Sequence, residues 1–497
     1  MFDTVGLDGF VNTKERNRLG VSLSMIFGIG IYTLIITHAI GLLRDPDTFW
    51  HIAVGRWIIE HTAVPTHGIF SATMANAPWV DQQWLAEVLM AWGYDHFGWW
   101  GLAIGTALCE AAAIAILLRV LLGSLPPVYA MFATTLAVVL WFPHVLARPY
   151  ILTTPILVIW VAALVQARTD DRAPSPWLAL LIVLWANLHG SFVFGIGVAA
   201  LFAAEAVLLA PDWQARVRTV RDWGFFGLAC VGAATLTPYS FKGLLFPLHL
   251  INMSALIYIG EWQGVDFSKS GGSSLSLLIW LLTVLFAALT LGWRLPPTRV
   301  GILLVLLTMA LKHLRYMELL GPVSALILAP SLASFVRQSV TSKGDRLMDE
   351  LALPANRRGS VISAVLILTV TAFAVHGKLS PPDVMTPAAA MADARSHGIK
   401  GPVFNSYKFG GYLIFSGTEP FIDGRVELYG NTFVKRFIDA VWLTNDQLPK
   451  LLDEYGITWT VLEADTSAVT LMDHLPGWRR LYQDSIAVVH VRQTKGG

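Results

Sequence analysis

The chain has 497 residues, of which 55% are hydrophobic and only 14% are charged, and its mean hydropathy is +0.58. Soluble domains usually carry about 25% charged residues, so this composition excludes a soluble enzyme and a disordered protein. The 35 basic and 34 acidic residues leave no basic excess for a phosphodiester backbone, and we expect no nucleic-acid partner. The two cysteines, Cys109 and Cys230, lie in apolar runs and predict neither a disulfide nor a zinc site. The composition indicates a membrane protein with many spans.

A membrane-spanning helix needs about 20 predominantly apolar residues. About 11 runs approach this length and predict one span each, at residues 20–43, 101–122, 126–142, 149–167, 176–189, 191–210, 223–237, 274–292, 299–311, 316–336 and 360–376. The first run follows Lys14, Arg16 and Arg18, and no short cleavage site of small residues comes after it. It therefore predicts a retained helix rather than a cleaved signal.

The distribution of Lys and Arg predicts the orientation, because cytoplasmic loops carry an excess of these residues. With the N-terminus in the cytoplasm, the basic clusters at 168–172, 216–221, 294–299 and 337–358 fall in inner loops. The outer loops before the tail then hold only scattered basic residues. An odd number of spans places the C-terminus outside.

Three segments interrupt the hydrophobic pattern. Residues 44–100 form a long first outer loop with amphipathic stretches at Phe49–Glu60 and Trp84–Phe97. In the second stretch apolar residues recur at helical spacing beside Glu87 and Asp95, which predicts a helix lying along the membrane surface. Residues 238–273 form a second outer loop.

The third segment is the tail, where the composition becomes that of a soluble domain from about Leu379. Alternating or β-rich segments predict strands, and amphipathic segments predict helices. The expected strands are Gly401–Asn405, Tyr412–Phe415, Ile457–Glu463 and Ile486–Val491, and the expected helices are Asn431–Leu443 and Asp446–Tyr455. The sequence thus predicts an all-α membrane domain over 1–378 and a small α/β domain over 379–497.

The strongest local signal is an acidic motif directly after the first span, in which Asp45, Asp47 and His51 lie close together. Such a group can act as a general base, as ligands of a divalent cation such as Mg²⁺ or Mn²⁺, or as both. The other interpretation is a solvated loop with an Asp-Pro turn. The motif lies where a lipid-linked substrate would present its head group, and this position favours a function.

Asp47 is the better candidate for the base, and Asp45 is the second. Asp45 precedes Pro46, whose ring biases it toward extended backbone, and it adjoins Arg44, which keeps it ionised. Asp47 lies four residues before His51 and shares a face with it if a helix starts here.

Basic residues collect at the predicted outer turns. The spans 176–189 and 299–311 are short, so their turns could lie below the membrane surface, where Arg and His would form a pocket for phosphate. Each residue taken alone is better explained by an interfacial side chain or a helix cap. The candidates for substrate binding are Arg148, His189, Glu261, Lys312, His313, Arg315 and, from the acidic motif, His51.

Two motifs in the tail combine glycines with polar residues, at 407–412 and 421–425. They are either tight turns between strands, with Asp423 and Arg425 paired, or loops that contact a ligand. No Gly-rich phosphate loop, nucleophile elbow or Cys/His cluster is present in the sequence.

Together these features resemble the GT-C superfamily of polytopic membrane glycosyltransferases, which combine a long acidic first outer loop, many spans and a soluble outer tail. More narrowly, short motifs along most of the chain resemble a group of bacterial membrane proteins of this architecture. These motifs are Asp-x-Asp-x-x-Trp-His at 45–51, Pro65 to Ser71, Trp84-Leu85, Arg148-Pro149, Asn187 to Gly190, Pro238-Tyr239 and Ile422 to Arg425.

The resemblance implies a bacterial inner-membrane enzyme that takes a sugar from a polyprenyl-phosphate donor and passes it to a periplasmic glycan, lipid or protein. It implies that the acidic loop supplies the base and that the basic outer turns hold the phosphate, and it adds Tyr239 to the binding candidates. The sequence departs from the pattern at His67, where an acid is expected, and at Gln83, where a Glu is expected. Asp81 lies close enough in the chain to compensate.

A different class of function is a translocator or assembly component for an envelope polysaccharide. A translocator should place ionisable groups along a path through the middle of the membrane. In this sequence they cluster on the outer side, which favours the enzyme.

Overall fold

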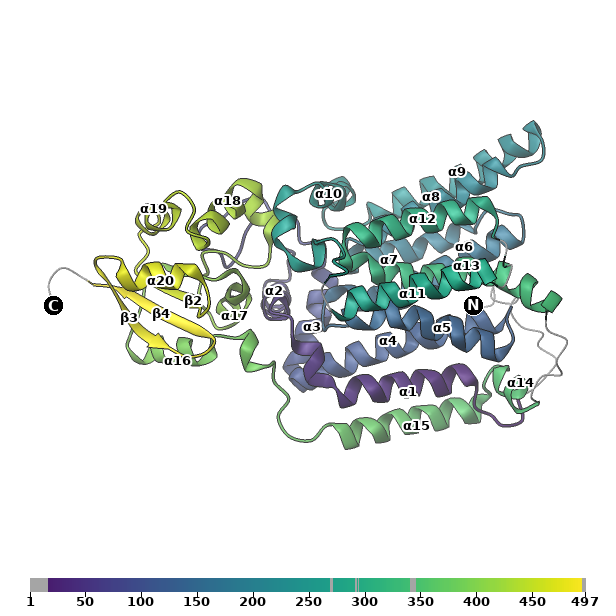
Figure 1. The fold of residues 1–497 in the computed structure, drawn as a ribbon, viewed down its shortest axis with the longest axis horizontal. Helices are drawn as coiled ribbons and strands as arrows, with labels where there is room; N and C mark the ends of the chain where they lie inside the picture. Colours follow the sequence, from purple (N-terminus) through teal and green to yellow (C-terminus); the bar gives the residue numbers. More distant parts are fainter. Residues whose placement is uncertain (1–16, 269–270, 291–292, 294, 340–345, 494–497) are drawn as a thin grey trace.

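The computed structural model describes residues 17–268, 271–290, 293, 295–339 and 346–493. Long helices form a bundle in one half of the molecule, and a mixed α/β domain forms the other end (Figure 1). The helices α2 and α10 lie near the junction between the two (Figure 1). The last helix of the bundle, α15, ends at Ala374, and the first helix of the mixed domain, α16, begins at Ala388.

The bundle contains a helix for each of the predicted spans. These helices are α1 (Leu23–Thr37), α4 (Trp99–Leu122), α5 (Pro127–Trp141), α6 (Thr154–Thr169), α7 (Leu180–Leu188), α8 (Phe192–Leu208), α9 (Trp213–Ala234), α11 (Gly272–Thr290), α12 (Pro297–Lys312), α13 (Met317–Ser339) and α15 (Arg357–Ala374). Among the described residues, 6 helical segments are long and apolar enough to cross a membrane. Shorter apolar helices include α1, α8 and α10.

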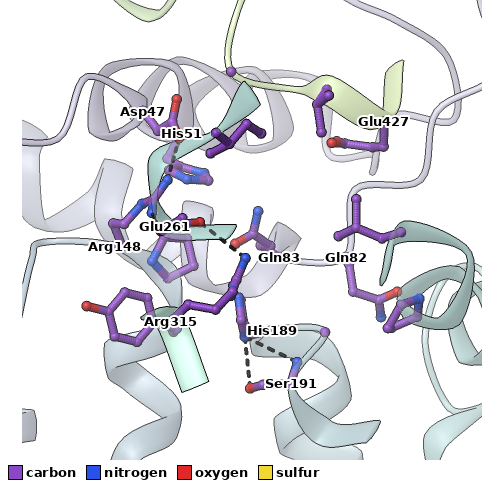
Figure 2. Close-up of a pocket in the computed structure, with 18 of the residues that line it drawn as sticks. Asp47, His51, Gln82, Gln83, Arg148, His189, Ser191, Glu261, Arg315 and Glu427 are labelled. Atoms are coloured by element: carbon purple, nitrogen blue, oxygen red, sulfur yellow. Dashed lines mark hydrogen bonds and ion pairs between the residues drawn. The ribbon is translucent and has the colours of Figure 1, made fainter. Parts of the chain in front are cut away.

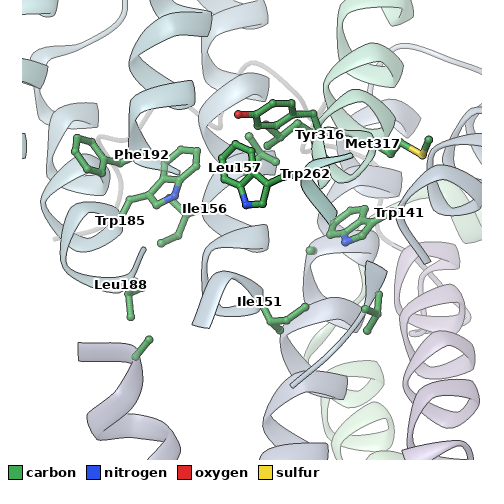
Figure 3. Packing of buried hydrophobic residues seen from close by; sticks show 14 of the residues in the cluster. Trp141, Ile151, Ile156, Leu157, Trp185, Leu188, Phe192, Trp262, Tyr316 and Met317 are labelled. Carbon is green, nitrogen blue, oxygen red and sulfur yellow. The ribbon is translucent and has the colours of Figure 1, made fainter. Parts of the chain in front are cut away.

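Large aromatic side chains fill the interior of the bundle. Trp141, Trp160, Trp185 and Phe192 are each less than 2% exposed, and Figure 3 shows several of them with Ile151 near the ends of their helices. The indole Nε1 of Trp160 donates to a backbone carbonyl at 2.8 Å, which satisfies its polar atom. Side chains therefore fill the interior of the bundle around these residues, and no open channel runs through it there.

One boundary differs from the sequence-based expectation. Arg216, Arg218 and Arg221, expected in an inner loop, lie on the first half of α9. Asp212 caps this helix by accepting the N–H of Ala215 at 2.7 Å, so the helix starts well before its apolar part. Hydropathy marks where the apolar part begins, but the cap determines where the helix begins.

The first outer loop forms two helices, α2 (Asp47–His61) and α3 (Trp84–Phe97), which pack closely against each other. Gly55 permits this contact, because a Cβ at that position would lie 2.0 Å from the backbone oxygen of Glu87. The expected surface helix is thus held between α2 and the bundle helices α4 and α7. Glu87, expected on the polar outer face, is fully buried.

The tail forms a sheet of order β1-β2-β4-β3. Strand β1 (Val403–Asn405) is parallel to β2 (Trp459–Glu463), with Phe404 opposite Thr460. Strand β4 (Ala487–Arg492) is antiparallel to β2 and to β3 (Trp478–Gln483). The helices of the tail are α16 (Ala388–Ser396), α17 (Gly410–Phe415), α18 (Val426–Val441), α19 (Gln447–Glu454) and α20 (Ser467–His474).

The expected strand Tyr412–Phe415 is wrong, because these residues belong to the helix α17. Four consecutive apolar residues fit a buried helix and a buried strand equally well, and here α17 packs on α2 instead of joining the sheet. Gly411 allows this contact, since a Cβ there would lie 2.4 Å from the carbonyl oxygen of Pro46. The tail therefore docks directly on the acidic motif.

The remaining elements are short. They are α10 (Phe241–Ile251), α14 (Arg346–Ala352) and the 3-10 turns Ala39–Leu43, Phe142–His144, Pro149–Thr153, Pro176–Ala179, Ser254–Tyr258, Gly260–Trp262, Leu314–Tyr316, Asp383–Met385 and Tyr407–Phe409.

Candidate functional site

A cavity of about 360 Å³ lies where the bundle, the first outer loop and the tail meet. Its walls come from segments far apart in the sequence (Figure 2). They are the acidic motif, residues 79–83, 148–150 and 189–191, α10 with the two turns after it, Arg315, and Tyr407, Gly424, Val426 and Glu427 of the tail. A concave site with a few converging polar groups is the usual form of a small-molecule site.

The acidic motif starts the helix α2. The buried carboxylate of Asp45 accepts the backbone N–H of Asp47 at 2.8 Å, which satisfies one of the free donors at the helix start. Asp47 is half-buried in the first turn of α2, where the helix dipole favours a negative charge. Both aspartates line the cavity.

Arg148 gathers the acidic side chains of the cavity. Its Nε lies 2.8 Å from Asp45 Oδ2, its Nη1 lies 2.6 Å from Glu261 Oε2, and its Nη2 pairs with Asp47. Arg315 binds the other oxygen of Glu261 at 3.1 Å and stacks on the ring of Trp262 at 4.4 Å. Three carboxylates and two guanidinium groups thus form one cluster with one carboxylate in excess.

The charges within this cluster shift its pKa values in opposite directions. Burial raises the pKa of Asp45 to about 7, although Arg148 opposes this shift. The expectation that Arg44 keeps Asp45 ionised is therefore wrong, since Arg44 donates to Gly41 O instead. Burial alone would also raise the pKa of Glu261, but Arg148 and Arg315 lower it to about 2. Near neutral pH the cluster thus holds one carboxyl group that exchanges a proton and one that stays ionised.

His189 lies on the same wall as Arg315 (Figure 2). It follows the end of α7, and its Nδ1 lies 2.8 Å from Ser191 Oγ. Burial, Arg315 and Arg148 lower its pKa to about 3. At neutral pH His189 therefore offers a hydrogen bond rather than a charge.

His51 also lines the cavity, but three of the binding candidates from the sequence, Lys312, His313 and Tyr239, do not. Lys312 is exposed, and His313 Nδ1 is 2.5 Å from the backbone oxygen of Trp262. Tyr239 lies behind the cavity, where its hydroxyl donates to Pro65 O at 2.6 Å and accepts the N–H of Asp81 at 3.0 Å. Tyr239 thus positions residues 80–83, which do line the cavity.

The two departures from the expected pattern lie in different places. His67 is exposed and pairs with Pro78 in an isolated bridge. Gln83 and Asp81 both line the cavity, and Asp81 Oδ1 accepts the N–H of Gln83 at 3.1 Å. Asp81 is therefore the acid of this segment that reaches the cavity.

The residues considered for a divalent cation are already engaged. Asp45 and Asp47 bind Arg148, and His51 Nδ1 lies 2.8 Å from Glu87 Oε1. In the part of the chain that the structure describes, no three His, Cys, Asp or Glu side chains are grouped to hold a metal ion. The residues do not fit a cation in this arrangement, because a guanidinium group lies between the two aspartates.

The tail contributes residues that sequence reasoning missed. Glu427 lines the cavity, its Oε1 accepts the indole N–H of Trp79 at 3.0 Å, and burial raises its pKa to about 7. Gly424 lies against Asp47, since a Cβ there would be 1.9 Å from Asp47 Oδ1. The glycine in the motif at 421–425 was the available signal, because it permits this close approach.

The predicted pair of Asp423 and Arg425 is present and fully buried. Arg425 Nε and Nη2 donate to the two oxygens of Asp423 at 2.8 and 2.7 Å. Arg425 also donates to Ile69 O at 2.9 Å, which ties the tail to the first outer loop. The expected turn between strands is wrong for the motif at 407–412, which forms a 3-10 turn and the start of α17. Both tail motifs place a residue at the cavity, Tyr407 and Gly424 respectively.

No protein-family model and no curated protein sequence matches this chain. Its fold is similar to that of the archaeal oligosaccharyltransferase AglB from Archaeoglobus fulgidus, solved with an inhibitory peptide and a dolichol-phosphate, at TM-score 0.52 and 10% identity over 89% of this chain and 69% of that one. It is also similar to ArnT from Cupriavidus metallidurans bound to undecaprenyl phosphate, at TM-score 0.51 and 12% identity over 95% and 98% of the two chains. Both are GT-C glycosyltransferases, so the predicted GT-C resemblance is confirmed at the level of the fold.

Proposed function

We propose that this protein transfers a sugar from a polyprenyl-phosphate donor to an acceptor at the outer face of a bacterial inner membrane. The observation that carries the proposal is the cavity, in which Asp47 lies within one cluster with Arg148 and Arg315. The similarity to folds solved with dolichol-phosphate and undecaprenyl phosphate supports the same kind of lipid carrier. The acceptor is a periplasmic glycan, lipid or protein.

The walls of the cavity suggest where each part of the donor binds. Phe246, Leu250 and Ile251 of α10 form an apolar wall, which suits the first units of a polyprenyl chain. Arg315 and His189 suit the phosphate, because a guanidinium group binds phosphate with two parallel hydrogen bonds. A phosphate on Arg315 would replace Glu261, which is its partner in the structure.

Asp47 is the proposed base. It accepts the proton of the acceptor hydroxyl as that oxygen bonds to the anomeric carbon of the sugar. The bond from this carbon to the phosphate oxygen breaks, and its electron pair leaves with the polyprenyl phosphate. A positioned base contributes about 10²–10⁴-fold to such a reaction, and fixed cations at the leaving phosphate lower the barrier further.

The test is direct transfer by the purified protein in lipid nanodiscs. We would offer a panel of undecaprenyl-phosphate sugars with extracted envelope material and measure the release of undecaprenyl phosphate and the labelled product. We expect one donor to be consumed by the wild type but not by Asp47→Asn. Transport of a labelled donor across a vesicle membrane without its consumption would instead support a translocator.

The proposed orientation has the N-terminus in the cytoplasm and the tail in the periplasm. It is supported by the excess of Lys and Arg on one side of the spans. Reporter fusions after Pro354 and at the C-terminus should report the cytoplasm and the periplasm respectively. Two readings on the same side would contradict both the orientation and an outward-facing cavity.

A further inference from the structure

A buried acid–histidine pair lies directly behind the acidic motif. His51 Nδ1 is 2.8 Å from Glu87 Oε1, and the two side chains are 3% and 0% exposed. The close packing of α2 and α3 at Gly55 brings them together, because Gly55 follows His51 by one helical turn and so lies on the same face of α2. A buried carboxyl that bonds one ring nitrogen fixes the tautomer and the orientation of the ring.

A second buried acid adjoins this pair. Asp81 and Glu87 are neighbours whose carboxyl groups influence each other, and both are almost fully buried. One oxygen of each, Asp81 Oδ2 and Glu87 Oε2, has no other partner among the described residues. Two adjacent buried carboxyl groups cannot both be ionised without strong repulsion, so they share one proton. Consistent with this, burial raises the pKa of Asp81 to about 6 and that of Glu87 well above its ordinary value.

The other ring nitrogen of His51 is free to act. His51 lines the cavity one helical turn after Asp47, with its ring on that of Trp50 at 3.7 Å between centroids. In the described part of the chain no hydrogen bond is recorded for Nε2. Burial, Arg148, His189 and Arg425 lower the pKa of His51 well below its ordinary value, so the ring is neutral at rest and one ring nitrogen carries a free lone pair. With the proton on Nδ1 toward Glu87, that lone pair is on Nε2. The ionisable groups that face this ring are Arg148, Arg425, His189 and the Glu87–Asp81 pair.

We propose that His51 is a second proton-transfer group of the site, and that Glu87 and Asp81 are its positioning residues. The inference rests on the proposed function, because it extends the path of the acceptor's proton. The O–H bond of the acceptor breaks, the proton goes to the Asp47 carboxylate, and from there it passes to Nε2 of His51. The imidazolium that forms is neutralised as the shared proton moves from Glu87 to Asp81, which leaves the negative charge on the Glu87 carboxylate beside Nδ1. Water in the cavity then removes the extra proton from Nε2. Asp47 thereby returns to its ionised pairing with Arg148 for the next acceptor.

The first experiment needs no substrate. In the purified wild type labelled with ¹⁵N-histidine, we expect His51 to carry its proton on Nδ1 at neutral pH, with its signals identified by their loss in His51→Asn. A proton on Nε2 would overturn the proposal, because the atom facing the cavity could then not accept another.

The second experiment measures transfer of the undecaprenyl-phosphate sugar that the donor panel identifies. Glu87→Gln keeps the shape and a hydrogen bond but removes the charge that stabilises the imidazolium, so we expect the rate to fall by about 10²-fold or more. Binding of undecaprenyl phosphate and the melting temperature should stay at the wild-type values. Glu60→Gln, the same change at the exposed end of α2, is the control and should transfer normally.

A structural role alone would leave the rate of Glu87→Gln unchanged, and a rate within threefold of the wild type overturns the proposal. If Glu87→Gln does not fold, His51→Asn decides, since Asn can still donate to Glu87 but offers no basic nitrogen. We expect the same loss of about 10²-fold in that variant, and normal transfer would overturn the proposal. An inactive wild type with every donor contradicts the proposed function itself, whereas an active wild type with an equally active Glu87→Gln contradicts only this inference.

Discussion

The two ends of the helix bundle each hold a cluster of acidic and basic side chains, centred on an arginine at one end and on a glutamate at the other. At the end facing the tail, Arg148 binds three carboxylates. At the far end, Glu205 of α8 binds Arg299 at 2.7 Å and Arg168 at 3.4 Å, and Thr298 donates to it at 2.9 Å. The two clusters lie at opposite ends of the helices α8 and α12, whose course is visible in Figure 1.

The two clusters also differ in the solvent exposure of their side chains. The side chains of Glu205, Arg168 and Arg299 are only 4, 9 and 11% exposed. This cluster is closed around a fully paired carboxylate, and of the three side chains only Arg168 lines a cavity at that end. The side chains of Asp47 and Glu261 are 21 and 31% exposed and border a cavity. An open cluster with an excess carboxylate can exchange a partner for an incoming proton or phosphate, whereas a closed cluster can only hold helices together. Composition alone does not separate the two, but the ratio of charges and the access to solvent do.

The largest expected effect is on catalysis at the open cluster. Asp47→Asn keeps the shape of the side chain but removes the base, so we expect transfer to fall by about 10²–10⁴-fold. Donor binding and membrane insertion should be retained. The assay is the release of undecaprenyl phosphate, and Asp171→Asn is the control, since Asp171 is 92% exposed and pairs with Arg168 at the closed end. Near-normal transfer by Asp47→Asn would remove Asp47 from the mechanism.

The second effect is on stability. Arg148→Ala leaves three carboxylates facing one another, and removing one partner of a buried ion pair costs about 3–5 kcal/mol. Because Arg148 is partly accessible at 17% side-chain exposure, we expect the lower end of this range. Thermal unfolding in detergent measures it, and lowering the pH should restore part of the loss because the carboxyl groups become neutral. A variant as stable as the wild type would show that the open cluster does not depend on its central cation.

Much of this site was predictable because its residues stand out against an apolar background. The acidic motif, Arg148, His189 and Arg315 are polar side chains at turns between apolar runs, and the structure brings them together at one cavity. The helices of the bundle were equally visible, since apolar runs of the right length leave few alternatives.

The residues that were missed depend on contacts between distant segments. Glu87 has the sequence pattern of a water-facing residue, and only the packing of α2 on α3 buries it. Glu427 and Gly424 reach the cavity because the whole tail docks on the first outer loop. Periodicity reports which face of a helix is polar, but it does not report what covers that face.

The third effect separates binding of the donor from the chemistry. Arg315→Ala removes a charged donor to the phosphate, and we expect the affinity for undecaprenyl phosphate to fall by about 1.5–3 kcal/mol. Arg315→Lys should recover only part of it, since an ammonium group cannot make the two parallel bonds. Calorimetry or fluorescence quenching in nanodiscs measures the affinity, with Lys242→Ala on the exposed side of α10 as the control. Unchanged affinity in Arg315→Ala would leave this residue as a partner of Glu261 only.

The smallest expected effect is a change in how stability depends on pH. Burial raises the pKa of Asp81 to about 6, compared with about 3.9 in an unfolded chain. Between these values the folded protein holds a proton that the unfolded chain has lost, so the stabilisation is complete below about pH 4 and disappears as the pH rises through about 6.

Asp81→Asn keeps the oxygen that accepts the N–H of Gln83 but cannot titrate. Its melting temperature should therefore fall less steeply than that of the wild type between pH 4.5 and 7, by roughly 2–4 °C for each kcal/mol of difference. Asp45 titrates in the same range, but it is present in both proteins, and the lowered pKa of Glu261 acts only below this range. The difference between the two curves thus reports the proton that the Asp81–Glu87 pair takes up near pH 6. Parallel curves would show that the folded pair takes up no proton in this range.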